Sequence, residues 1–211
     1  MADDTTTNLF PQPIINLLGD KVALGPQDKR LIPLMTAWDN DFVTNGISGD
    51  DLKPFTQASV AASVETRLRE GREGWYGFTI YERATWRLIG HTNLRDVNTV
   101  HRTGEIGILI GERDCRGKGY GTEVVRLILD FAFNGLNLHN VWLDTLSVNP
   151  SAVASYTRAG FREIGRRREA YRIGGQTYDV ILMDCLARDF QRPDVPGWGM
   201  AGVLDAISGS R

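Results

Sequence analysis

The order of apolar and polar positions along this chain predicts a series of short helices and strands. Apolar residues at helical spacing predict helices over residues 28–38, 56–70, 119–134 and 150–159. Runs of branched and aromatic residues predict strands over residues 21–24, 76–82, 87–97, 104–110, 141–148, 161–173 and 177–186. The order of these elements predicts a single α/β domain with a mixed, mostly antiparallel central sheet and helices on both faces.

The two ends of the chain differ in pattern from its middle. Residues 1–16 are mostly polar with two prolines, so we expect an N-terminal arm. Residues 17–190 contain the periodic segments and form the predicted domain. Residues 191–211 begin with prolines and are rich in glycine, which predicts a C-terminal tail outside the core.

A glycine-rich segment lies between the predicted strand 104–110 and the helix that follows it. The segment and the next helical residue are Arg116, Gly117, Lys118, Gly119, Tyr120, Gly121 and Thr122. Strand, glycine loop and helix together favour phosphate binding, because the loop amides and the positive end of the helix point at one anion. We expect Arg116 and Lys118 to add mobile positive charge at the rim. The spacing of these glycines differs from that of a P-loop and of a dinucleotide-binding loop. This difference counts against an ATP- or NAD-binding protein.

Composition and charge exclude several classes of protein. The chain has 211 residues, of which 42% are hydrophobic and 24% charged, so a globular core is expected. A net charge of -2 without a long basic run argues against a nucleic-acid binder. Two cysteines favour a reducing cytoplasm, and no apolar run approaches the ~20 residues of a membrane span. The three histidines and two cysteines have no metal-ligand spacing, so no metal is expected.

A second motif follows the predicted strand 141–148. Asn149, Ala152, Tyr156 and the pair Gly160-Phe161 match the pattern N-x-x-A-x-x-x-Y-x-x-x-G-F. Together with the loop pattern [QR]-x-x-G-x-[GA], this segment resembles the GNAT superfamily of acetyl-CoA-dependent N-acetyltransferases, in the branch of ribosomal-protein and spermidine N-acetyltransferases. The resemblance implies a GNAT-like fold whose strands splay at the cofactor site, and dimers are common in that branch.

The resemblance also implies roles for individual residues. Tyr156 would protonate the departing thiolate, and Glu105 would act as a base through water. His101 or water alone are alternative bases, and Asn149 could instead cap the helix after it. The residues expected to bind acetyl-CoA, partly through their backbone, are Ile108, Leu109, Ile110, Arg116, Gly117, Lys118, Gly119, Tyr120, Gly121, Thr122, Asn149, Ser155 and Tyr156.

The activity implied by the resemblance is transfer of an acetyl group from acetyl-CoA to a primary amine by direct attack on the thioester. A thioester intermediate on Cys115 is not expected, because no His or Asp lies at a recognisable spacing from it. The acceptor could be a polyamine-like molecule, an antibiotic amine or a protein N-terminus. A loop is expected over residues 39–54. Its aspartates, Asp39, Asp41, Asp50 and Asp51, could attract a cationic acceptor or could form an ordinary hydrophilic surface. The alternative function is a non-catalytic acyl-CoA-binding or sensor domain on the same fold.

Overall fold

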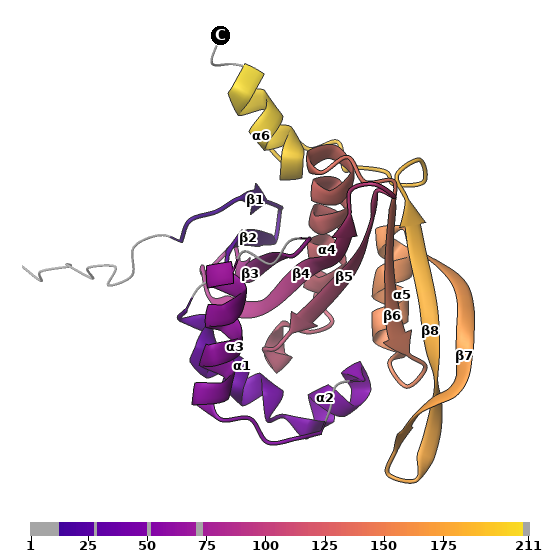
Figure 1. Ribbon diagram of the computed structural model, residues 1–211. Coiled ribbons are helices and arrows are strands. Elements are labelled where there is room, and N and C mark those ends of the chain that lie inside the picture. The colour runs from indigo at the N-terminus through magenta and orange to yellow at the C-terminus, as the bar shows by residue number, and fades with distance from the viewer. Residues whose placement is uncertain (1–12, 28, 50–51, 71–73, 209–211) are drawn as a thin grey trace, which may run out of the picture.

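A twisted eight-stranded sheet forms the frame of the molecule (Figure 1). The computed structural model describes residues 13–27, 29–49, 52–70 and 74–208. The strands lie in the order β1-β2-β3-β4-β5-β6-β8-β7. They are β1 (Leu17–Leu18), β2 (Val22–Pro26), β3 (Tyr76–Glu82), β4 (Leu88–Asn98), β5 (Thr103–Ile110), β6 (Asn140–Leu146), β7 (Arg162–Ile173) and β8 (Gln176–Leu186).

Helices cover the two faces of this sheet. They are α1 (Leu31–Asp39), α2 (Phe42–Ser48), α3 (Gln57–Glu70), α4 (Tyr120–Asp130), α5 (Pro150–Ala159) and α6 (Gly199–Ser208). A 3₁₀ turn (Arg113–Cys115) precedes α4, and a π-helical turn (Phe131–Gly135) continues it. The predicted single α/β domain with a mostly antiparallel sheet is therefore confirmed.

Two hydrophobic cores lie on opposite faces of the sheet, because side chains alternate along each strand. Ile106, on β5, packs into the larger core with the apolar side of α4. Leu109, three residues further along, packs against the smaller core formed by α1 and α3, which includes Trp38. The sheet therefore separates the α4–α5 layer from the α1–α3 layer.

β5 and β6 are the one parallel pair of neighbours in this sheet, and they pair over a short length. Thr103–Glu105 of β5 pairs with residues 140–142 of β6, and no further pair joins these two strands in the described chain. β5 nevertheless stays paired with β4 up to Ile110, and β6 stays paired with β8 up to Leu146. The two strands therefore diverge beyond Glu105, and the predicted splay is confirmed; Figure 1 shows the gap opening toward α2.

The C-terminal segment differs from its prediction. Trp198 is 3% exposed and belongs to the larger core. The carboxylate of Asp130, which is fully buried, accepts a hydrogen bond of 2.6 Å from the amide of Met200 in the first turn of α6. A carboxylate at a helix N-terminus is stabilising, because it meets unpaired amides and the positive end of the helix dipole. The expectation that residues 191–211 lie outside the core is therefore wrong for Trp198 and for the first turn of α6, whereas the end of α6 is exposed.

The loop expected at residues 39–54 contains the helix α2, so that part of the prediction is wrong. Most of the expected N-terminal arm, residues 1–12, lies outside the described residues, whereas the amide of Asn16 donates to the carbonyl of Leu24 at 2.8 Å. None of the described helices is both long and apolar enough to cross a membrane.

Candidate active site

The glycine loop takes a backbone conformation that most residues avoid. After β5 and the 3₁₀ turn, Gly117 and Gly119 have φ of 73° and 85°. Positive φ values in this range cost residues with a side chain about 1–2 kcal/mol, because Cβ approaches the following carbonyl. Gly119 directly precedes Tyr120, the first residue of α4. The two glycines therefore let the chain turn sharply into the helix.

The amides of this loop are available to a ligand. Within the described parts of the chain, no residue accepts a hydrogen bond from the amides of residues 117–122. A Cβ at Gly117 would meet no atom within 4 Å, whereas one at Gly119 would lie 3.4 Å from Lys21 Nζ, so a cationic side chain stands beside the turn. Six consecutive amides that lead into the first turn of an 11-residue helix form a group of donors suited to an anion such as a phosphate.

Arg116 does not provide mobile charge at the rim. Its guanidinium Nε donates to the carbonyl of Ile110 at 2.9 Å, and Nη2 donates to the carbonyl of Gly111 at 3.1 Å and to Thr44 Oγ1 at 3.2 Å. Burial lowers the pKa of this guanidinium. Arg116 therefore fixes the end of β5 to the loop and to α2, which corrects the expectation made from the sequence.

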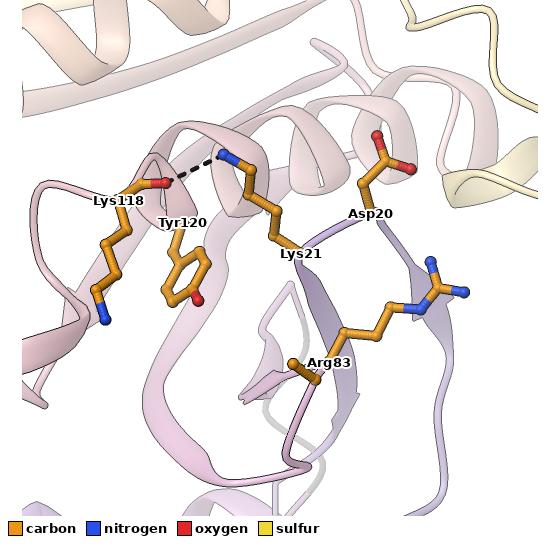
Figure 2. Close-up of a pocket in the computed structure, with 6 residues that line it drawn as sticks. Asp20, Lys21, Arg83, Lys118 and Tyr120 are labelled. Carbon is orange, nitrogen blue, oxygen red and sulfur yellow. Dashed lines mark hydrogen bonds between the residues drawn. The ribbon is translucent and has the colours of Figure 1, made fainter.

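A pocket of about 540 Å³ lies beside the loop and is shown in Figure 2. Lys118 and Tyr120 line it from the loop and α4, and Lys21 and Arg83 line it from the start of β2 and the β3–β4 turn. The ammonium of Lys21 donates to the carbonyl of Lys118 at 3.2 Å. Sequence reasoning missed Lys21 and Arg83, because both lie in polar turns distant from the glycine motif and outside any recognisable pattern.

Tyr120 is held in this pocket by a carboxylate. Its hydroxyl donates to Glu82 Oε1 at 2.7 Å, and this hydrogen bond is the main cause that raises the pKa of Tyr120 to about 12. The ring is therefore fixed at the start of α4 rather than free to move.

Three further predicted residues join α4, α5 and α2. Thr122 Oγ1 and Ser155 Oγ are 2.8 Å apart, so α4 and α5 are in contact beside the loop. Asn149 caps α5, because its Oδ1 accepts from the amide of Ala152 at 3.1 Å, and its Nδ2 donates to the carbonyl of Ile47 at 3.4 Å. The capping alternative for Asn149 is therefore confirmed.

Tyr156 lies on α5 and packs against the larger core. Its ring centroid is 6.1 Å from that of Phe161. Burial, followed by the charge of Asp144, raises the pKa of Tyr156 to about 12. The phenol is consequently protonated at neutral pH and can donate a proton or a hydrogen bond.

The groups considered as bases or nucleophiles lie in different settings. Glu105 is buried on β5 and ion-paired with Arg95 of β4. His101 is exposed in the β4–β5 turn, beyond the end of β5 that is distant from the glycine loop. Cys115 is 1% exposed, and burial raises the pKa of its thiol. Cys115 therefore lacks the setting of an activated nucleophile, which is exposed and has a lowered thiol pKa.

The aspartate group expected between the first two helices is only partly described. Asp50 and Asp51 lie outside the described residues. Asp41 caps α2 by accepting from the amide of Thr44 at 3.4 Å, and it also accepts from Thr44 Oγ1 at 2.6 Å and forms an ion pair of 2.8 Å with Arg113. These hydrogen bonds lower the pKa of Asp41 to about 2. Asp41 therefore has a structural partner, and its charge is neutralised by Arg113.

No three His, Cys, Asp or Glu side chains gather to hold a metal ion in the described ranges. Lys21, Arg83 and Lys118 line the pocket beside the loop amides, and this arrangement suits an anionic ligand.

Comparisons with known proteins identify relatives of this chain. A family model described as "Acetyltransferase (GNAT) domain" matches residues 26–162. The spermidine N(1)-acetyltransferase of Vibrio cholerae is 37% identical over 104 residues, which are 49% of this chain and 60% of that protein. The enzyme of the same name from Escherichia coli K12 is 33% identical over 94 residues, which are 44% of this chain and 50% of that protein. The matches thus span half to three fifths of these two relatives.

Solved structures share the fold over a greater length. A crystal structure of spermidine N-acetyltransferase from Vibrio cholerae in complex with CoA and spermine superposes with a TM-score of 0.73. The superposition covers 81% of this chain and 98% of that one at 23% sequence identity. A dodecameric structure of the same Vibrio cholerae enzyme has a TM-score of 0.67 at 26% identity, covering 80% and 95% of the two chains.

Proposed function

Since this chain belongs to the GNAT acetyltransferase family, we propose that it transfers an acetyl group from acetyl-CoA to a primary amine. The observation that carries this proposal is the row of unpartnered amides at residues 117–122, placed at the start of α4 beside the splay of β5 and β6. The amides bind the diphosphate, and the gap between the strands receives the pantetheine arm and the thioester.

The reaction needs a neutral amine, an oxyanion site and a proton for the leaving sulfur. An alkyl amine has an unperturbed pKa near ~10, so its nitrogen must lose a proton during the reaction. Attack on the thioester carbonyl forms the C–N bond, and collapse of the oxyanion breaks the C–S bond. Backbone groups of Ile108, Leu109 and Ile110, on the edge of β5 that β6 leaves unpaired, support the oxyanion and the pantetheine. Tyr156 gives its proton to the sulfur.

The acceptor we propose first is a small polyamine-like amine. Relatives that act on spermidine by name support this choice. A protein N-terminus is the second candidate, supported by the putative ribosomal N-acetyltransferase YdaF of Bacillus subtilis, which is 30% identical over 104 residues. Antibiotic amines remain a third class to be tested.

The test has two steps. Thermal shift with CoA and acetyl-CoA measures binding, and release of CoA thiol is then followed with spermidine, spermine, an aminoglycoside and a short peptide with a free N-terminus. We expect stabilisation by both cofactor forms and thiol release with at least one amine. Binding without thiol release from any amine would instead favour the non-catalytic acyl-CoA-binding alternative.

A matched pair of glycine variants controls for backbone strain. Gly119→Glu places a carboxylate and a strained φ at the loop, and we expect at least a tenfold loss of acetyl-CoA affinity. Gly175→Glu introduces the same residue at a similar φ of 79° in the β7–β8 turn, where a Cβ meets no atom within 4 Å. Equal loss in both variants would mean that strain, and not the diphosphate contact, causes the effect.

Assembly and location are also part of the proposal. The dodecameric relative from Vibrio cholerae supports self-association of this chain, with a homodimer as the smallest unit. Light scattering after size exclusion tests it, and a single monomeric peak at tens of micromolar would contradict it. We propose a cytoplasmic location, supported by two buried free thiols, Cys115 and Cys185.

A further inference from the structure

Asn93, in the middle of β4, carries a buried oxygen that has no hydrogen-bond partner. Within the described ranges, two buried side-chain oxygen atoms lack a partner, Gln27 Oε1 and Asn93 Oδ1. An unpaired buried acceptor costs free energy, so few remain in folded proteins without a reason. Gln27 directly follows the end of β2, whereas Asn93 lies on the strand next to β5, which borders the gap (Figure 1). The oxygen of Asn93 is therefore the one that a ligand in the gap can pair.

A glycine on β5 gives this carboxamide access to the gap. Asn93 pairs with Gly107, which lies two residues beyond Glu105, the last residue of β5 that pairs with β6. A Cβ on Gly107 would lie 3.2 Å from both Oδ1 and Nδ2 of Asn93, so the carboxamide extends over the space that a side chain would fill. Residues 107–110 are all partly exposed, whereas residues 104–106 are buried. The carboxamide therefore lies over β5 where this strand begins to border an open gap.

Asn93 faces the side of the sheet opposite the cofactor loop. Its neighbour Leu94 packs into the larger core with α4, so the side chain of Asn93 points to the other face. His91, two residues earlier on β4, lies on the same face as Asn93, and its ring stacks on Trp38 of α1 at a centroid distance of 6.4 Å. The loop amides of residues 117–122 lead into α4, on the opposite face. A molecule that meets Asn93 therefore reaches the thioester from the side opposite the diphosphate.

We propose that Asn93 is an acceptor-binding residue, whose Oδ1 accepts a hydrogen bond from the nitrogen of the amine as this nitrogen approaches the thioester carbonyl. This inference rests on the proposed acetyl transfer and adds a residue of the acceptor site to it. Direct attack requires the amine and the cofactor to be bound at the same time, and Asn93 lies on the face that the diphosphate leaves free. A carboxamide oxygen accepts hydrogen bonds but takes no proton at neutral pH, so Asn93 positions the amine without acting as a base.

Two variants of Asn93 separate the hydrogen bond from the shape of the side chain. Asn93→Leu has about the same volume but no acceptor oxygen, and we expect kcat/KM for the best amine of the panel to fall at least about tenfold, the usual scale for a hydrogen bond to a charged group. KM for acetyl-CoA should stay within about twofold of the parent, because Asn93 faces away from the cofactor loop. Asn93→Asp keeps an acceptor oxygen and should recover most of the loss.

The matched control removes the same functional group from a distant site. Gln191 is exposed and follows β8 beyond Leu186, at the end of this strand that is remote from the gap. Gln191→Leu should therefore retain the kcat/KM of the parent for both substrates.

A spectroscopic readout on the parent protein requires neither turnover nor a variant that folds. The side-chain NH₂ signals of Asn93 are followed in ¹⁵N NMR spectra, first with CoA and then with the best amine added to the CoA-saturated protein, or with spermidine if no amine gives thiol release. We expect little change with CoA and a saturable shift with the amine. A shift that is complete with CoA alone would assign the oxygen to the pantetheine arm and overturn the inference. Unchanged signals with both ligands would leave a bound water as the partner and would also overturn it.

The kinetics of the variants provide two further contradicting results. In one, Asn93→Leu keeps kcat/KM for the amine within threefold of the parent. In the other, Asn93→Leu and Asn93→Asp lose activity equally, which would show that the fit of the side chain and not its oxygen is needed. Absence of thiol release from the parent with every amine would reject the proposed function separately, and the signals of Asn93 would still decide whether an amine binds there.

Discussion

Tyr156 is the single residue whose protonation state bears most directly on the proposed reaction. With its pKa raised to about 12 by burial, the phenol stays protonated through the pH range in which amines become neutral. We expect Tyr156→Phe to lower kcat by about 100-fold with little change in KM for acetyl-CoA. Steady-state kinetics test this. Tyr76→Phe, which removes the same atom from a ring packed on Phe131, is the control. Equal kcat in Tyr156→Phe and the parent would exclude the acid role.

Asp41 gives a prediction about stability and pH. Its pKa is lowered to about 2 by Thr44 and Arg113, so its contribution to the free energy of unfolding is complete above the ordinary carboxyl pKa of 3.8 and is lost as pH falls toward 2. Asp41→Ala should cost about 1 kcal/mol near pH 7. Asp41→Asn, which keeps a capping oxygen, should cost less. Urea unfolding measures both values.

The pH dependence of this difference in unfolding free energy tests whether the charge of Asp41 is responsible for it. The difference between Asp41→Ala and the parent should shrink as the pH falls from 5 toward 2, because the carboxyl of the unfolded chain, with its ordinary pKa of 3.8, takes up a proton before the folded one does. A difference that stays constant over this range would show that the carboxylate charge is not involved.

Sequence patterns identified which types of residue lie at the site better than they identified where the side chains point. The loop glycines follow from local backbone geometry, whereas Tyr156 was selected by the match to the family motif. The direction of Arg116 depended on carbonyls of Ile110 and Gly111 that the end of β5 presents, which no local pattern encodes. Lys21 and Arg83 reach the pocket only through strand pairing.

At the scale of elements, α6 shows what a composition argument misses. Glycine and proline made its segment resemble a tail, yet Trp198 fills the larger core and Asp130 caps the helix. We expect Trp198→Ala to lower the free energy of unfolding by about 3–5 kcal/mol, the usual cost of truncating a buried aromatic side chain. Trp86→Ala, at a side chain 37% exposed, should cost much less. Similar costs in chemical denaturation would contradict the packing of α6.

The helix α2 was missed for a different reason. The glycines and aspartates of this segment made it resemble a loop, although Asp41 caps the helix and Gly49 ends it with φ of 87°. Tertiary contacts decide such short helices: Arg116 donates to Thr44, and Asn149 donates to the carbonyl of Ile47. The longer helices α3, α4 and α5 were predicted because their apolar periodicity extends over several turns.

At the scale of the whole molecule, the fold class followed from the order of elements. The position of the cofactor gap did not follow from periodicity, because it depends on where the parallel pairing of β5 and β6 stops. The family resemblance predicted the gap between the strands, and the pairing of Glu105 with Trp142 shows where the gap begins. The gap lies between the layer that contains α4 and α5, with the loop amides, and the layer that contains α1 to α3.

The most direct measurement of the central claim is a titration of the ¹⁵N-labelled protein with CoA, followed amide by amide in NMR spectra. Hydrogen bonds from residues 117–122 to the diphosphate should give the largest chemical-shift changes in the protein at these amides, with smaller changes at Gly175 in the distant hairpin turn. CoA binding that leaves the amides of residues 117–122 unchanged, while others shift, would contradict the proposed site.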